Sequence, residues 1–98
     1  MIELTPPQRQ YLQCLAHATQ PVAMIGDKGL TDAVLKEIDR ALSSHELIKI
    51  KAASGQRNTR QAWLTEICTT LSAAPVQQIG RMLVVYRPSE KPGITLPR

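Results

Sequence analysis

The sequence contains no phenylalanine, one tryptophan and two tyrosines among its 98 residues. Proteins that bind single-stranded nucleic acid by stacking successive bases need several aromatic side chains on one surface. This composition excludes a stacking platform of that kind. We expect Tyr11 and Tyr86 to be half-buried core residues, whereas Trp63 lies off the strongest apolar stripe of its helix and leaves either role open.

The sequence also lacks the signals of a membrane or secreted protein and of a catalytic site. No apolar run approaches the roughly 20 residues of a membrane span, and the N-terminal MIELTPPQRQ does not resemble a secretory signal, so we expect a cytoplasmic protein. Cys14 and Cys68 fall in helix-like segments and are predicted to be reduced core thiols. Cys14 and His17 are too few for a metal site, and we expect neither metal nor cofactor. His45 has no nucleophile at a recognisable spacing, and we expect no enzyme activity.

The charge balance favours an acidic partner. Twelve Lys and Arg residues stand against eight Asp and Glu residues, a formal net charge of +4 at pH 7. Nucleic acid is the commonest acidic partner, although an excess of this size also occurs in proteins that bind none. With 43% hydrophobic residues the chain has enough apolar material for one core, and we predict a single domain over 1–98 with no required oligomer.

Helix and strand signals alternate along the chain. Thr5 with Gln8, and Asn58 with Gln61, have the spacing of helix capping boxes. The apolar run at 22–25 does not alternate and predicts a short strand covered on both faces. The predicted elements are a helix from Thr5 to near Pro21, a strand at 22–25, a helix from a Thr31 cap to near Ser44, a strand at 45–52, a helix from an Asn58 cap through Leu64 to Leu71, a strand at 75–79 and a strand at 81–87.

The strand HELIKIKA, at 45–52, has two different faces. Its alternation places Ile48, Ile50 and Ala52 on an inner face and Leu47, Lys49 and Lys51 on a basic outer face. Strands joined through helices pair in parallel, whereas the last two strands, joined at Gly80, form a hairpin. We therefore predict an α/β fold in α-β-α-β-α-β-β order, with a four-stranded mixed sheet packed with helices and an extended tail at 88–98.

The stretch MIGDKGL, residues 24–30, holds two of the five glycines. It follows the first strand at its carboxyl end, where open α/β sheets tend to bind ligands, and it precedes the helix capped by Thr31. It matches neither the Walker loop nor the dinucleotide fingerprint. A Gly, two variable residues and Gly is the loop with which KH-type domains clamp a nucleic-acid backbone, but a plain strand-to-helix turn fits equally well.

The chain resembles the CRM domain family, in particular its small YhbY-like bacterial members. The resemblance rests on PVAMIGDKGLTDAVLKEIDRALSSHELIKIK and on VQQIGRMLVVYRP, and it extends from about Leu4 to the closing LPR. It implies a fold like the C-terminal domain of the third translation initiation factor and a function in RNA binding and ribosome assembly on precursors of the large ribosomal subunit. It nominates Gly26, Asp27, Lys28 and Gly29 as an RNA contact.

Basic residues outside this loop extend the candidate RNA surface. Lys49 and Lys51 share one strand face, Arg57 and Arg60 follow that strand, and Arg81 and Arg87 flank the last strand. Single residues of this kind are commonly a solvated rim, but the set predicts a continuous basic patch. The alternative is an adaptor on ribosomal particles that uses helix faces or the tail to bind protein, with no direct RNA contact.

Overall fold

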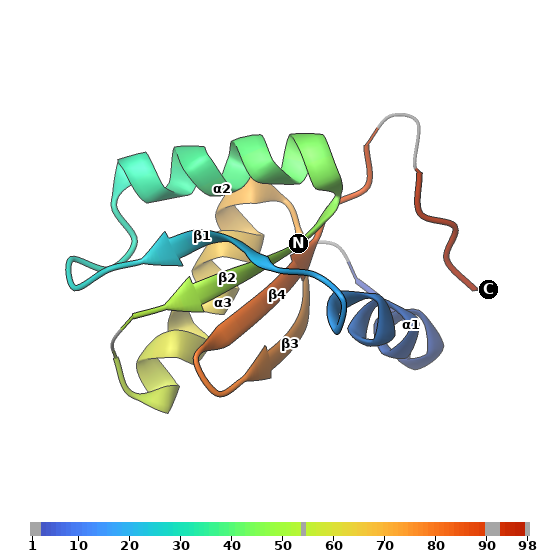
Figure 1. The fold of residues 1–98 in the computed structure, drawn as a ribbon, viewed down its shortest axis with the longest axis horizontal. Coiled ribbons are helices and arrows are strands. Elements are labelled where there is room, and N and C mark those ends of the chain that lie inside the picture. Colours follow the sequence, from blue (N-terminus) through green and yellow to red (C-terminus); the bar gives the residue numbers. More distant parts are fainter. Residues whose placement is uncertain (1–2, 54, 90–92, 98) are drawn as a thin grey trace.

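A four-stranded mixed sheet runs through the middle of the protein, with helices on both of its faces (Figure 1). The structure is a computed structural model that describes residues 3–53, 55–89 and 93–97. Its elements are α1 (Pro6–Ala16), β1 (Pro21–Ile25), α2 (Asp32–His45), β2 (Leu47–Ala52), α3 (Arg57–Leu71), β3 (Ala74–Ile79) and β4 (Met82–Tyr86). The predicted order of elements and the mixed four-stranded sheet are both confirmed.

The strands lie in the order β1-β2-β4-β3. β1 pairs with β2 in parallel, as expected for strands joined through a helix, and β4 pairs antiparallel with both β2 and β3. The β3–β4 hairpin turns at Gly80, whose φ of +54° suits glycine. Because β4 runs antiparallel to both β2 and β3, and β1 runs parallel to β2, the carboxyl ends of the first three strands and the start of β4 meet at one end of the sheet.

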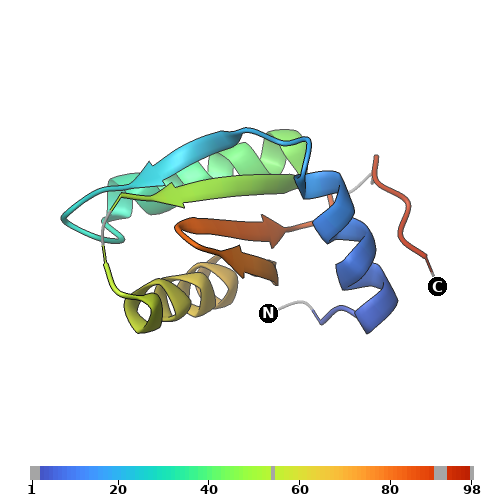
Figure 2. The same cartoon turned by 60° about the horizontal axis from the view of Figure 1, so that its bottom comes forward.

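Two apolar clusters hold the layers together. On one face, α2 and α3 bury Ile38 and Ile67 against Ile48 and Ile50 of β2. On the other face, α1 packs Leu12 against a smaller cluster that includes Leu47, Ala74, Val84 and Tyr86. Full burial of a side chain such as Leu12 contributes about 2 kcal/mol to folding. β2 therefore buries apolar side chains on both faces, and α1 covers the end of the sheet away from the loops that follow β1 and β2 (Figure 2).

Three sequence predictions about the elements were wrong in detail. β1 is an edge strand, and Met24 on its outer face is 55% exposed, so the strand is not covered on both faces. The third helix begins at Arg57 after Gln56, so Asn58 is not its cap. The first helix ends at Ala16, well before Pro21, although its capping box of Thr5 and Gln8 is confirmed.

The described part of the C-terminal segment contacts the body of the protein without forming a helix or strand. Ile94 and Leu96 pack against the cluster beneath α1. The Gln8 amide donates to the Pro97 carbonyl at 3.1 Å, and the Gly93 N–H donates to Glu46 Oε1 at 2.6 Å. Residues 93–97 therefore lie at the end of the sheet where α1 packs.

Candidate nucleic-acid interface

Three connections meet at the end of the sheet opposite to this segment, which we call the loop end (Figure 1). They are the β1–α2 loop, the β2–α3 loop and the β3–β4 turn. Backbone hydrogen bonds tie them to one another, because the Ala53 N–H donates to the Ile25 carbonyl at 2.8 Å and the Ala52 N–H donates to the Arg81 carbonyl at 2.7 Å. Residues far apart in the sequence are thereby held as one surface.

The glycine loop is a tight turn with its charged residues at the tip. The Gly29 N–H donates to the Gly26 carbonyl at 3.0 Å, and Asp27 and Lys28 between them are exposed. Gly29 has a φ of +73°, where other residues are strained, whereas Gly26 does not and has open space where a Cβ would lie. Only the second glycine is thus required by the conformation of the turn.

The helix that follows this turn is capped by the protein itself. Thr31 Oγ1 accepts from the Val34 N–H at 3.2 Å, which confirms the predicted cap. Asp32 lies in the first turn of α2, and its charge, like that of Asp27, opposes an anion there. Attraction of a phosphate to this loop therefore depends on Lys28 and on cations supplied by neighbouring elements.

Trp63 of α3 lies close to both the β1–α2 loop and the β2–α3 loop. A Cβ added at Gly29 would lie 3.4 Å from Trp63 Cζ2, and one added at Gly55 would lie 3.0 Å from Trp63 Cη2. Gly55 also has a φ of +99°. The indole packs against the larger core, so the two loops rest on a single half-buried ring of α3. The sequence left the role of Trp63 open, because its contact with Gly29 joins segments that are far apart in the chain.

Most of the nominated basic residues gather around the loop end. Lys28, Lys51, Arg57 and Arg81 are exposed there, and Arg60 is half-buried. Arg60 Nη1 donates to the Gly55 carbonyl and Arg81 Nη1 donates to the Ala53 carbonyl, so both also brace the β2–α3 loop.

Lys49 lies farther from the loop end, on the face of the sheet that α1 covers in part. It is half-buried and pairs with Pro21 of β1 and Val84 of β4. Lys51 lies two residues nearer the loop end on the same face, between Met24 and Met82. The outer face of β2 therefore presents an exposed cation only at Lys51, near the loop end. At the other end of the strand, Leu47 is buried under α1.

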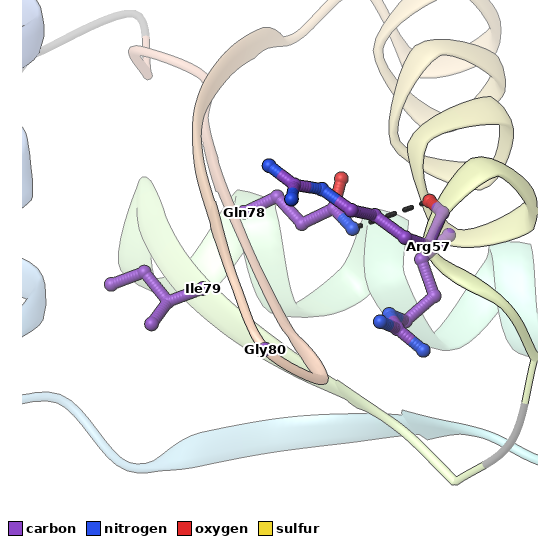
Figure 3. Close-up of a pocket in the computed structure, with 5 residues that line it drawn as sticks. Arg57, Gln78, Ile79 and Gly80 are labelled. Carbon is purple, nitrogen blue, oxygen red and sulfur yellow. Dashed lines mark hydrogen bonds between the residues drawn. The ribbon is translucent and has the colours of Figure 1, made fainter.

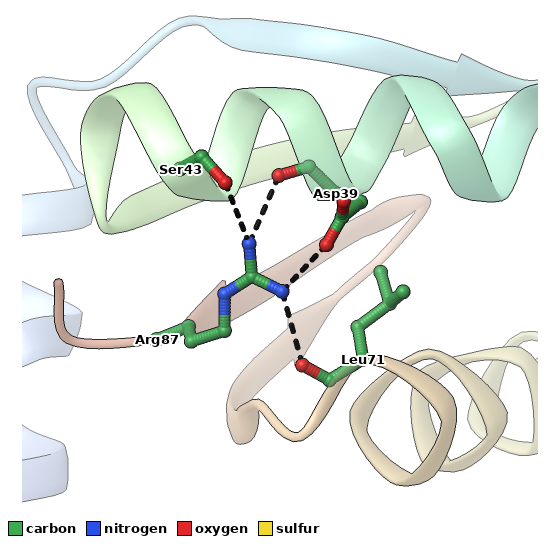
Figure 4. Close-up of polar contacts among 4 residues, drawn as sticks. All are labelled: Asp39, Ser43, Leu71 and Arg87. Atoms are coloured by element: carbon green, nitrogen blue, oxygen red, sulfur yellow. Dashed lines mark hydrogen bonds and ion pairs between the residues drawn. The ribbon is translucent and has the colours of Figure 1, made fainter.

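Arg87 does not belong to this surface, and its place in the predicted patch is not supported by the geometry (Figure 4). Its guanidinium forms an ion pair with Asp39 at 2.7 Å and donates to Ser43 Oγ at 3.0 Å and to the Leu71 carbonyl at 3.1 Å. These partners belong to α2 and to the end of α3. Arg87 therefore joins three elements at the opposite end of β4 from Arg81.

A polar hollow of about 400 Å³ opens between the start of α3 and the β3–β4 turn. Arg57, Arg60, Gln78, Ile79 and Gly80 line it. Gln78 extends toward Arg57 and its Nε2 donates to the Arg57 carbonyl at 3.4 Å, whereas the Ile79 side chain points away from Arg57 (Figure 3). The sequence did not nominate Gln78, because it lies twenty-one positions from Arg57 and only the sheet topology brings the two together.

The cysteines and histidines form no reactive cluster. Within the described ranges, no three His, Cys, Asp or Glu side chains are grouped so that they could hold a metal ion. Both cysteines are free, but Cys14 is exposed rather than in the core, which corrects the prediction for that residue. Burial raises the pKa of the Cys68 thiol to about 12, so Cys68 is protonated and unreactive at neutral pH. None of the described helices has the length and apolar character needed to cross a bilayer.

Comparison with known proteins places this geometry in context. The family model for the CRS1 / YhbY (CRM) domain matches residues 4–87. The chain is 50% identical over 98 residues to a Haemophilus influenzae protein named RNA-binding protein, a match that covers 100% of this chain and 99% of the relative. It is 42% identical over 93 residues to a Pseudomonas aeruginosa protein named a probable RNA-binding protein, a match that covers 95% of this chain and 89% of the relative.

The fold is also found in a solved structure. A solution structure of a Staphylococcus aureus protein superposes with a TM-score of 0.86 at 34% sequence identity, over 97% of this chain and 100% of the other. The two proteins therefore share the layered α/β arrangement described above.

Proposed function

This chain belongs to the CRS1 / YhbY (CRM) domain family, and on that premise we propose that it binds structured RNA in the cytoplasm through the loop end of its sheet. The names of its relatives support RNA as the partner. The proposed contacts are the glycine turn with Lys28 and the cations around it, which are Lys49, Lys51, Arg57, Arg60 and Arg81.

The finer proposal is that the RNA is that of precursor large ribosomal subunits, on which the protein assists assembly as a monomer without catalysis. This rests on the resemblance to YhbY-like bacterial proteins. Binding that depends on several phosphate contacts weakens steeply with salt, so the protein can leave the particle by simple dissociation when its RNA site changes.

The gathering of exposed cations around a glycine turn is the observation that carries the proposal. Lys28 of the β1–α2 loop, Lys51 of β2, Arg57 of α3 and Arg81 of the β3–β4 turn all lie at the loop end. With no phenylalanine and a half-buried Trp63, the surface offers charge and backbone rather than stacked rings. Such a surface suits the phosphates of a folded RNA.

The test combines a map of RNA contacts in cells with a charge variant in vitro. Ultraviolet crosslinking followed by sequencing is expected to give crosslinks concentrated in one region of large-subunit ribosomal RNA. With purified protein, Lys28→Ala should reduce the dependence of log affinity on log salt by about one contact, while Arg40→Ala, an exposed cation on α2, should leave it unchanged. Equal salt dependence in all three proteins excludes Lys28 as a contact.

A protein partner is the second candidate, because part of the sheet face is apolar and open. Met24 and Ile79 are 55% and 48% exposed, and they lie in one row across the sheet with Lys51 and Met82 between them. A ribosomal protein that packs on this row would make the chain an adaptor. Association with ribosomal particles that survives nuclease treatment, together with an absence of RNA crosslinks, would favour this candidate.

A further inference from the structure

We propose that the hollow between α3 and the β3–β4 turn receives a single unpaired nucleotide of the bound RNA. The inference deepens the proposed function and rests on it, because it names the kind of RNA that the loop end selects. It concerns Gln78 and the backbone of Ile79 and Gly80, which the charge pattern of the sequence does not single out.

The two arginines supply groups for the phosphate and for the face of a base. The Arg57 guanidinium has no hydrogen-bond partner within the described part of the chain, and its side chain is exposed. Arg60 is held by the Gly55 carbonyl through Nη1, while its buried Nε has no partner among the described residues. A guanidinium can bind phosphate oxygens by paired N–H groups, and its plane can stack on a base.

Gln78 supplies a group that can read the edge of a base. Its Nε2 makes one long hydrogen bond of 3.4 Å to the Arg57 carbonyl, and its side chain extends into the hollow (Figure 3). A glutamine amide both donates and accepts, as the edges of bases do. Ile79 and Gly80 complete the lining, and apart from the residues next to it in the chain no described atom lies within 4 Å of the position of a Cβ at Gly80, so a flat ring can approach the turn closely.

The size of the hollow favours a nucleotide over a bare phosphate or a duplex. About 400 Å³ is at the small end of pockets that bind small molecules, and it exceeds the need of one phosphate group. A paired base inside a helix cannot enter it, whereas a bulged or looped-out base enters without breaking a pair. The RNA that fits is therefore a structured one with an unpaired nucleotide beside its phosphate contacts.

A chain of contacts links the hollow to the glycine turn. Arg60 lines the hollow and holds Gly55, and Gly55 shares the ring of Trp63 with Gly29. An RNA backbone on Lys28 could thus place the next nucleotides over α3. The two sites would act on neighbouring parts of the same strand.

Two RNA hairpins that differ only by one bulged nucleotide in the stem test the inference. Wild-type protein should bind the bulged hairpin roughly tenfold more tightly than the fully paired one, which is the effect of about one well-placed base contact. Gln78→Ala should remove most of this preference and leave affinity for the paired hairpin unchanged. Gln61→Ala, an exposed glutamine on α3, and Arg40→Ala are the matched controls and should retain the preference.

The outcomes separate this inference from the proposed function. Equal binding of the two hairpins, or a preference that survives Gln78→Ala, overturns the nucleotide site while leaving RNA binding intact. If neither hairpin binds, the proposed function fails for structured RNA of this kind. Amide NMR with uridine monophosphate and with inorganic phosphate then tests whether the hollow binds a nucleotide. Shifts at residues 78–80 with the nucleotide but not with phosphate support the site, and equal shifts or none overturn it.

Discussion

At the scale of single residues, the two glycines of the β1–α2 turn differ in how far the structure constrains them. Gly29 has a φ of +73°, and a Cβ added there would lie 3.4 Å from Trp63 Cζ2, whereas Gly26 has neither constraint. We expect Gly29→Ala to lower the free energy of unfolding by about 1–2 kcal/mol, because a Cβ is unfavourable in the left-handed region. Gly26→Ala is the matched control and should change stability by no more than a few tenths of a kcal/mol.

Urea unfolding of the two variants, followed by fluorescence of the single tryptophan, measures this difference. Gly29→Ala should also change the native emission, because its new methyl group lies against the indole. Equal stability of the two variants would mean that the turn adapts at no cost, and that Trp63 does not fix its shape.

Residue identity alone could not separate Arg81 from Arg87. Both flank β4 and both were predicted to contact RNA, yet residues at the two ends of a strand of this length lie about 20 Å apart. Arg81 is exposed at the loop end, whereas the Arg87 guanidinium forms an ion pair with Asp39 and hydrogen bonds with Ser43 and the Leu71 carbonyl. The partners of Arg87 come from α2 and α3, and no local pattern in the sequence pairs them with it.

At the scale of elements, α3 begins without a side-chain cap. Gln56 is the N-cap residue and forms no capping hydrogen bond, whereas α1 and α2 are capped by threonines. Gln56→Ser should therefore stabilise the protein by about 1 kcal/mol. Gln56→Asp should stabilise it at least as much, because a negative charge also favours the helix N-terminus.

The two substitutions should have opposite consequences for RNA. Gln56→Asp places a negative charge beside Arg57, so affinity for the bulged hairpin should fall severalfold at low salt, while Gln56→Ser should bind as the wild type does. Thermal unfolding and hairpin binding measure the two effects on the same samples. Equal RNA affinity of both variants would show that the start of α3 lies outside the contact.

The elements themselves were predictable where one local signal decides them. The capping box at Thr5 and the Thr31 cap predicted two helix starts correctly, and the alternation at 45–52 predicted β2, although the strand begins at Leu47 and His45 belongs to α2. Local sequence signals failed where the burial of a residue depends on packing against another element. Met24 is exposed because β1 lies at the sheet edge, and the packing of Ile94 and Leu96 depends on a cluster built from α1 and three strands.

At the scale of the whole molecule, topology explains which part of the candidate site was predictable. Parallel strands bring the loops after β1 and β2 to one end, and this follows from the order of helices and strands. The insertion of β4 between β2 and β3 does not follow from that order. It places the β3–β4 turn beside α3, and so creates the hollow between Gln78 and Arg57.

Global stability should depend on pH through two buried groups, Cys68 in the cluster beneath α2 and α3 and Tyr86 in the cluster beneath α1. Burial raises the pKa of Cys68 to about 12, and burial together with the charge of Glu46 raises the pKa of Tyr86. The unfolded chain therefore loses these protons at lower pH than the native state does. Between about pH 9 and pH 12 the native state binds more protons, so the free energy of unfolding falls as pH rises, and it is fully retained below about pH 9.

Cys68→Ala isolates the thiol in this decline. A single group of this kind contributes a slope of up to about 1.4 kcal/mol per pH unit, which the variant should lose, although a small cavity lowers its stability at neutral pH by about 1 kcal/mol. Urea unfolding under reducing conditions between pH 8 and pH 11 measures the slope. Cys14→Ala removes an exposed thiol and should keep the wild-type slope. If Cys68→Ala declines as steeply as the wild type, the thiol does not govern the alkaline stability of the fold, and Tyr86, whose pKa is also raised, becomes the group to test.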